Sequence, residues 1–155
     1  MPAAPAPEYA CRFRRRTTRL PIRGLACAVH EWGEPGAPLL VLLHGWADTG
    51  ASFQFLADAL AAYWHVIAPD WRGFGDTDRA PGGYWFPDYL ADLDALLEHF
   101  SPGAGACLVG HSMGGNIATL YAGSRPERVA ALVNMEGLGL EPRSPDEAPG
   151  RYRQW

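Results

Sequence analysis

The sequence predicts an α/β fold, with a mostly parallel sheet and helices on both faces. Short apolar runs of strand length alternate along the chain with segments of helical spacing, which is typical of a parallel sheet with right-handed crossovers. The chain has 155 residues, of which 48% are hydrophobic and 19% are charged, so it suits one domain with a buried core. The formal net charge of -4 argues against a general nucleic-acid binder. No apolar run approaches the roughly 18 residues of a membrane helix.

The N-terminal part is expected to hold a flexible leader and an edge hairpin. Residues 1–10 begin with a Pro/Ala-rich stretch that lacks the charged and apolar regions of a secretory signal. Six arginines lie between Arg12 and Arg23. We interpret them as the solvated face of an edge hairpin, whose charge opposes aggregation, and docking of an anionic partner is the alternative. Alternating side chains over residues 25–29 predict a strand.

Four buried strands and three helices are expected next, in alternation. Continuous apolar runs, which are typical of strands covered on both faces, predict strands over residues 39–43, 65–68, 106–109 and 129–133. Apolar residues at helical spacing predict helices that include Phe53 to Tyr63, Leu90 to Phe100 and Met113 to Tyr121. In an open α/β sheet, the chemistry is expected just beyond the carboxyl ends of the strands.

The third of these strand ends carries the sharpest motif, Gly110-His111-Ser112-Met113-Gly114. A Gly-x-Ser-x-Gly turn between a strand and a helix is typical of a nucleophile elbow. The glycines let the neighbouring chain pass close to the turn, and Ser112 projects at a helix N-terminus that favours negative charge. An oxyanion hole needs two backbone N–H groups aimed at one point. Met113 and Trp46, in the segment His44-Gly45-Trp46, are the candidates.

Three segments together resemble the serine hydrolases of the α/β-hydrolase fold family. They are HGWADTGASF (44–53), DWRGFGDT (70–77) and GHSMGG (110–115), and the resemblance covers about residues 22–140. It implies that Ser112 is the nucleophile, that Trp46 and Met113 are the oxyanion donors, and that no cofactor is needed. Thr77 stands where the family more often has serine. Haloalkane dehalogenases and epoxide hydrolases of this fold use aspartate at the elbow, so serine favours an acyl-enzyme here.

Several other chemistries are not expected from these residues. The sequence has no lysine, which excludes a Schiff-base lysine, a Ser-Lys dyad and a Walker-type phosphate loop within it. Cys11, Cys27 and Cys107 form no Cys-x-x-Cys pair, so we expect three reduced, buried thiols in a cytoplasmic protein and no zinc site. Gly73-Phe74-Gly75 lacks the third glycine of a nicotinamide-binding fingerprint.

The base that the serine needs is not found among the histidines of the sequence. In this fold the chain order is Ser, then Asp or Glu, then His. None of the five histidines follows Ser112, and we expect none of them to serve as the base: His30, His44, His65, His99 and His111. Glu136 follows the last predicted strand, where some relatives place the acid, whereas most place it one strand later. Asp70 and Arg72 are interpreted as structural ties of their loop.

The C-terminal part is expected to lead into a cap over the site. Residues 11–140 correspond to the N-terminal part of the α/β-hydrolase core, and residues 141–155 to the start of a truncated cap. Ser144-Pro145-Asp146-Glu147 has the cap, proline and glutamate of a helix start. The C-terminal strands and most of the cap are thus expected to be missing. An uncovered apolar sheet edge should make the 155 residues poorly soluble or molten.

Two functions remain open from the sequence. The first is a serine hydrolase that attacks an ester-like carbonyl through an acyl-enzyme, with the histidine outside these 155 residues. An amide, or a C–C bond in a diketone, is an alternative substrate. The second is a catalytically inactive, short α/β-hydrolase-like protein that binds a partner. Both hypotheses include a small-molecule or protein partner but no nucleic acid, membrane or metal, and the oligomeric state stays undetermined.

Overall fold

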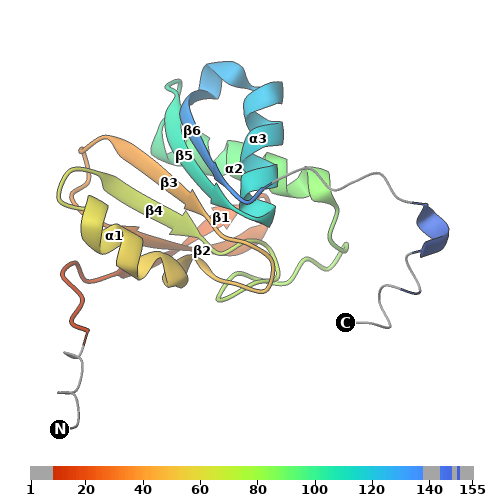
Figure 1. Cartoon of the computed structure of the whole chain (residues 1–155), viewed down its shortest axis with the longest axis horizontal. Coiled ribbons are helices and arrows are strands. Elements are labelled where there is room, and N and C mark those ends of the chain that lie inside the picture. The colour runs from red at the N-terminus through yellow and green to blue at the C-terminus, as the bar shows by residue number, and fades with distance from the viewer. Residues whose placement is uncertain (1–8, 138–143, 148–149, 151–155) are drawn as a thin grey trace, which may run out of the picture.

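The protein folds as a six-stranded mixed sheet with helices on both faces (Figure 1). A computed structural model describes residues 9–137, 144–147 and 150. The strands are β1 (Arg16–Ile22), β2 (Leu25–Trp32), β3 (Leu39–Leu43), β4 (His65–Pro69), β5 (Ala106–His111) and β6 (Val129–Met135). The α-helices are α1 (Gln54–Leu60), α2 (Phe86–Phe100) and α3 (Met113–Ser124), and the 3₁₀ helices are η1 (Gly50–Phe53), η2 (Pro126–Arg128) and η3 (Pro145–Glu147). The predicted α/β fold is confirmed.

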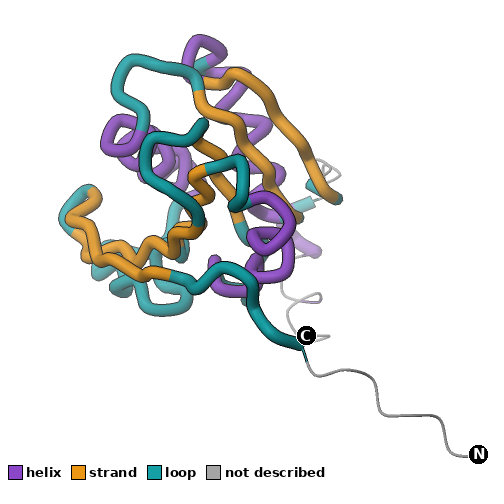
Figure 2. The backbone as a smooth tube through the Cα atoms, turned by 90° about the vertical axis from the view of Figure 1, so that its left-hand side faces the viewer, coloured by secondary structure: helices purple, strands orange, loops and turns teal. Residues whose placement is uncertain are grey.

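The sheet runs in the order β1-β2-β4-β3-β5-β6. Strands β4, β3, β5 and β6 are parallel to one another, and β2 pairs antiparallel with both β1 and β4. The register places Leu40 beside Val66 and Leu43 beside Gly110. Figure 2 shows how far the sheet twists between its two ends. This arrangement brings the carboxyl ends of the parallel strands to one edge, where the chemistry was expected.

The core has two layers because β3 is buried on both faces. Val41 and Leu43 lie in a cluster that α2 and α3 cover. Leu40 and Leu42 lie in the opposite cluster, which includes Ala57 of α1. Side chains of a strand alternate between faces, so a strand between two helical layers must be apolar at every position. This explains the continuous run that predicted it.

Strand β1 lies at the edge of the sheet, as the interpretation of the arginine-rich segment predicted. Two of the arginines pair with acidic groups, Arg19 with Asp78 at 2.6 Å and Arg23 with Asp88 at 3.1 Å. These side chains are 29% to 51% exposed, so each pair adds little stability. Their main physical effect is to charge an edge that would otherwise offer free backbone groups to another strand.

Two expectations differ from the structure. The helix expected to include Phe53 and Tyr63 begins as a 3₁₀ turn and ends at Leu60, which leaves the Tyr63 side chain 76% exposed. Its apolar spacing continued past the point where the backbone turns towards β4. All three cysteines were expected to be buried, but only Cys27 is, and Cys107 is half-buried. Cys11 is exposed because it precedes β1 and lies outside both core clusters.

The segments expected to form the leader and cap are described only in part. Tyr9 donates a hydrogen bond from its hydroxyl to Asp58 in α1, so the chain packs on the domain from this residue onward. The expected helix start at Ser144 is a short 3₁₀ helix, in which the Ser144 hydroxyl accepts a bond from the Asp146 N–H. The rest of the expected cap lies outside the described residues. No helix in the described ranges has the length and apolarity to cross a membrane.

Strand β6 forms the other edge and is the most exposed of the parallel strands. Val133 and Met135 are 53% and 36% exposed, although both continue an apolar strand. Their neighbours in β5 on the same face, Val109 and His111, are only half-buried. Val133 and Met135 thus give this unpaired edge an exposed apolar surface, whereas the core clusters themselves are buried. We therefore expect association through β6 rather than a molten core.

Val133→Lys should reduce this association, because it places a charge on the exposed face of the edge strand. Sedimentation velocity should show concentration-dependent oligomers for the unchanged chain and mainly monomer for the variant. Ala59→Lys, at an exposed position of α1, serves as a control for the added charge and should leave the oligomers in place. An unchanged chain that stays monomeric at every concentration would contradict the prediction.

Candidate functional site

Ser112 forms a strained turn between β5 and α3. Its backbone has φ 50° and ψ -115°, which lies in a region that residues other than glycine rarely adopt. The turn is held by two backbone bonds: the Ser112 N–H donates to Met135 O at 2.8 Å, and the Asn116 N–H donates to Ser112 O at 3.0 Å. Ser112 is the N-cap of α3, yet its hydroxyl makes no capping hydrogen bond. The hydroxyl is therefore held at the helix N-terminus without being used to close the helix.

The glycines on either side of Ser112 are required by close backbone contacts. A Cβ on Gly110 would clash with the carbonyl oxygen of Gly114, one turn further on. A Cβ on Gly114 would clash with the carbonyl oxygens of Leu43 and His44, at the end of β3. The spacing in the sequence thus reflects two packing constraints, which together fix the elbow against the neighbouring strand.

The loop after β3 lies directly against the elbow. A Cβ on Gly45 would lie 3.2 Å from the Cβ of Ser112. His44 is fully buried and holds this loop with both ring nitrogens: Nδ1 donates to Gly45 O at 2.7 Å, and Nε2 accepts from the Trp71 N–H at 3.0 Å. Burial lowers the pKa of His44 and outweighs its bond to Gly45. A neutral His44 therefore positions the segment that carries the Trp46 N–H.

Aromatic packing next to this loop was not predicted from the sequence. The Trp46 ring is 58% exposed and packs edge-on against Phe74, with ring centroids 5.2 Å apart. Phe74 also packs edge-on against His44 at 5.6 Å. Phe74 had been considered only as part of a glycine-rich segment, and the sequence alone gave no sign that the two loops meet. The Trp46 ring thus presents an exposed apolar surface on the loop whose Gly45 lies against Ser112.

The loop after β4 is tied down by the residues that were interpreted as structural. The Asp70 carboxylate accepts bonds from the backbone N–H of Gly50 at 2.7 Å and of Asp76 at 2.9 Å. Thr77 donates to Asp70 O at 2.7 Å and accepts from the Ala28 N–H at 2.8 Å, so the hydroxyl that serine would supply is kept. These bonds fix the loop that presents Phe74.

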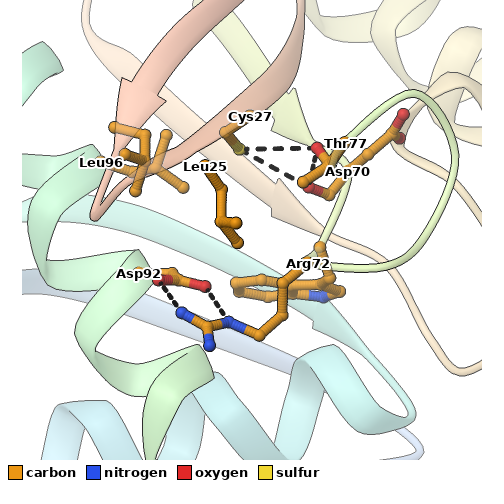
Figure 3. Close-up of a pocket in the computed structure, with 9 residues that line it drawn as sticks. Leu25, Cys27, Asp70, Arg72, Thr77, Asp92 and Leu96 are labelled. Carbon is orange, nitrogen blue, oxygen red and sulfur yellow. Dashed lines mark hydrogen bonds and ion pairs between the residues drawn. The ribbon is translucent and has the colours of Figure 1, made fainter. Parts of the chain in front are cut away.

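A small cavity lies under the same loop (Figure 3). Its volume is about 10 Å³, and Cys27, Arg72 and Leu96 are among its lining residues. Arg72 points across it to α2, where it makes two hydrogen bonds of 2.7 Å to Asp92. Burial raises the pKa of the Cys27 thiol to about 11. The cavity is therefore a packing feature with an inert thiol, and it lies under the site rather than at Ser112.

None of the five histidines is hydrogen-bonded to Ser112 in the described part of the chain. His44 uses both ring nitrogens as described above. His30 bonds to Thr17 and Asp70, and His65 bonds to Glu31 at 3.0 Å. His99 packs against Phe100 in the last turn of α2, and His111 packs against Gly45. Each of these rings thus has another contact in the described structure, and the absence of a base among them stays a prediction.

Glu136 and its neighbours form a second tight turn after β6. Glu136 is exposed and has φ 60°, and it follows Met135, whose carbonyl holds the Ser112 N–H. Asn134, which the sequence analysis missed, donates to Thr119 Oγ1 at 2.8 Å and accepts from the Gly137 N–H at 2.7 Å. Asn134 thereby ties this turn to α3. The assignment of Glu136 as the acid stays a prediction.

The buried neutral His44 predicts a loss of stability in mild acid. Its pKa is below the ordinary value of about 6.5 in the folded state. Between the two pKa values the unfolded chain binds more protons, so the free energy of unfolding should fall as the pH drops below about 6.5. One such group gives a slope of at most about 1.4 kcal/mol per pH unit. The free energy of unfolding, measured with urea between pH 7.5 and 5, should depend less on pH in His44→Gln than in the unchanged chain. An equal pH dependence in both would contradict the attribution to His44. His99→Gln is the matched control.

The chain is similar to known proteins both as a member of a family and in individual matches. Residues 38–155 match the family model described as alpha/beta hydrolase fold. A serine hydrolase-like protein of Danio rerio is 33% identical over 131 residues, which is 80% of this chain and 38% of that protein. Epoxide hydrolase A of Mycobacterium tuberculosis is 39% identical over 115 residues, which is 70% of this chain and 35% of that protein.

Solved structures agree with these sequence matches. The thioesterase domain from the curacin biosynthetic pathway has a TM-score of 0.80 and 29% identity, over 91% of this chain and 51% of that one. Potato epoxide hydrolase I has a TM-score of 0.76 and 30% identity, over 85% of this chain and 42% of that one. The chain spans about half or less of the length of each of these proteins.

Proposed function

Because this chain belongs to the α/β-hydrolase fold family, we propose that it supplies the nucleophile half of a serine hydrolase that acts on an ester-like carbonyl. The observation that carries the proposal is the strained Ser112, held between Gly110 and Gly114 at the N-terminus of α3. Strain of this kind persists only where the surrounding structure fixes it, and it is concentrated at functional sites. A small-molecule substrate and a cytoplasmic location are part of this proposal.

The proposed reaction begins with attack of Ser112 Oγ on the substrate carbonyl carbon. The N–H groups of Trp46 and Met113 hold the negative oxygen that develops, assisted by the dipole of α3. A histidine outside these 155 residues accepts the serine proton and passes it to the leaving alcohol. Water then attacks the acyl-enzyme, and the acid and the free serine are formed. Within this chain, His44 positions the oxyanion site, because its ring is hydrogen-bonded to Gly45 and Trp71 and so holds the loop of Trp46.

Relatives with different chemistry do not change the proposed intermediate. Epoxide hydrolase A is among the similar proteins, and the resemblance implies that such enzymes use an aspartate at the elbow. The elbow of this chain carries Ser112, which favours an acyl-enzyme over an alkyl-enzyme. The exposed Trp46 side chain, on the loop whose Gly45 lies against the elbow, favours esters with an apolar group. An amide, or the C–C bond of a diketone, remains an alternative substrate.

One observation favours a second function. The Ser112 hydroxyl has no histidine partner among the described residues, which fits a catalytically inactive binding or interaction protein. The two functions differ in the reactivity expected of Ser112. A correctly positioned serine that lacks only its general base should react faster when a base is added from solution. The serine of a catalytically inactive binding protein should not.

Labelling with a fluorophosphonate probe tests the difference. In this chain we expect slow labelling of Ser112, in which the Oγ–P bond forms as the P–F bond breaks. Added imidazole should accelerate it, since a well-placed general base contributes about 100-fold or more. Ser112→Ala should abolish the label, whereas Ser101→Ala, at the end of α2, should leave it unchanged. Absence of labelling at every imidazole concentration would favour the binding protein.

A further inference from the structure

A second hydroxyl, imidazole and carboxylate are linked across β1, β2 and the end of β4, whereas the elbow follows β5. Thr17 in β1 lies directly across from His30 in β2. Thr17 Oγ1 is 2.9 Å from His30 Nδ1, and His30 Nε2 is 3.1 Å from Asp70 Oδ1. The chain of contacts therefore runs from the edge strand through the buried imidazole to the end of β4. The proposed hydrolase mechanism uses neither Thr17 nor His30.

The protons in this linkage are fixed by Asp70. Burial alone would raise the pKa of Asp70, but hydrogen bonds from His30, Asp76 and Gly50 outweigh it, and the pKa lies below its ordinary value. An ionised carboxylate only accepts hydrogen bonds, so the His30 proton lies on Nε2. In the neutral imidazole, Nδ1 then carries a lone pair that can accept a hydrogen bond from the Thr17 hydroxyl. Serine, histidine and aspartate in a catalytic triad have the same order of protons, with the two ring nitrogens exchanged.

The hydroxyl end of the linkage is open to solvent, whereas the other two groups are not. Thr17 is exposed, and His30 and Asp70 are each only 2% exposed. Arg19 is on the same face of β1 as Thr17, since side chains two residues apart in a strand share a face. Arg19 and Arg23 are neutralised by ion pairs with acidic side chains, so the positive charge here comes from the other four arginines of residues 9–30, which form no ion pair among the described residues: Arg12, Arg14, Arg15 and Arg16. A positively charged surface of this kind attracts anionic reagents and stabilises an oxyanion that forms beside it.

We propose that Thr17 is a second nucleophile, an acyl-acceptor site that takes its acyl group from an anionic donor of the acyl phosphate class. Thr17 Oγ1 bonds to the carbonyl carbon while its proton moves to His30 Nδ1. The resulting imidazolium is held by the Asp70 carboxylate. The bond between the carbonyl carbon and the phosphate oxygen breaks, and the phosphate leaves with the electron pair. The product is a threonine ester, and His30 then releases the proton to water.

Thr18 provides an internal control for this proposal. It is the next residue on the same strand and is also exposed, but its hydroxyl bonds to Glu31 Oε1 at 3.2 Å and has no imidazole partner. After treatment with acetyl phosphate, mass spectrometry with peptide fragmentation should assign an acetyl group to each position. We expect Thr17 to react about 100 times faster than Thr18, which is the contribution of a positioned general base. The sequence has no lysine, so no ε-amino group competes for the reagent.

Three variants complete the test. Thr17→Ser keeps the linkage with a less hindered hydroxyl and should react at least as fast, whereas Thr17→Val should not be acetylated at this position. His30→Gln, with its fold checked by circular dichroism, should lower the rate at Thr17 to that at Thr18. Ser112→Ala should leave acetylation of Thr17 unchanged, so this site can fail or succeed independently of the proposed hydrolase. Equal rates at Thr17 and Thr18 in the unchanged chain would overturn the proposal, even if His30→Gln did not fold.

Discussion

Gly114→Ala should lower the rate of fluorophosphonate labelling at Ser112 by about 100-fold in the presence of imidazole. The added Cβ would clash with the carbonyl oxygens of Leu43 and His44, which are backbone atoms and cannot rotate away. The elbow and the loop of Trp46 must therefore separate, and a displacement of about 1 Å is enough for a loss of this size. The extra volume should also cost about 1–3 kcal/mol of stability. Labelling kinetics and urea unfolding measure the two effects separately.

Gly123→Ala is the matched control for this variant. Gly123 lies in the same helix, and a Cβ at this position would meet no atom within 4 Å. Alanine is a better helix former than glycine, so stability should stay the same or rise slightly, and labelling should not change. If Gly114→Ala were labelled as fast as Gly123→Ala, the contact between the elbow and the loop after β3 would not matter for the nucleophile.

Asp92→Ala should lower the free energy of unfolding by about 3–5 kcal/mol. The Asp92 carboxylate binds Arg72 through two hydrogen bonds of 2.7 Å, and both side chains are less than 10% exposed. Removing the Asp92 carboxylate leaves the buried Arg72 guanidinium with only the partly exposed Asp88 to balance its charge. Urea unfolding in the Val133→Lys background, which is expected to stay monomeric, measures the change. The loop of Asp70 and Phe74 should loosen as well, since Arg72 ties it to α2.

Asp88→Ala tests whether the large loss of stability expected in Asp92→Ala is due to the burial of the ion pair. Asp88 also pairs with Arg72, at 3.2 Å, but its side chain is 29% exposed, so its removal should cost about 1 kcal/mol or less. The double variant Arg72→Met with Asp92→Leu should recover most of the lost stability, because apolar residues of similar volume can replace a buried ion pair. Equal losses in Asp92→Ala and Asp88→Ala would contradict the role given to the buried pair.

Much of the fold was predictable because the signals that encode it are local. Continuous apolar runs indicated β3, β4 and β5, and these strands are buried between two helical layers. The elbow was found for the same reason, since a strand, a turn with glycines at fixed positions and a helix occupy consecutive residues. The end of α1 was misplaced because apolar spacing does not report where the backbone turns towards the next strand.

Contacts between segments that are far apart in the chain could not be predicted from the sequence. The edge-on packing of Trp46 against Phe74 joins two loops 28 positions apart, and the linkage of Thr17, His30 and Asp70 joins β1, β2 and the loop after β4. Each depends on strand order and register, which no local pattern encodes. The burial of Cys27 and the exposure of Cys11 differ for a similar reason, because the thiol itself is compatible with both environments.

The sequence by itself determined the α/β architecture, the place of the elbow and the absence of lysine chemistry. All three follow from residue types and from short spacings along one segment. Only the tertiary structure decided which histidine nitrogens are occupied, which carbonyl groups require Gly110 and Gly114, and which edge of the sheet stays apolar and exposed. These properties depend on the crossovers between β3, β4 and β5, which bring residues that are far apart in the chain within hydrogen-bonding and van der Waals distance.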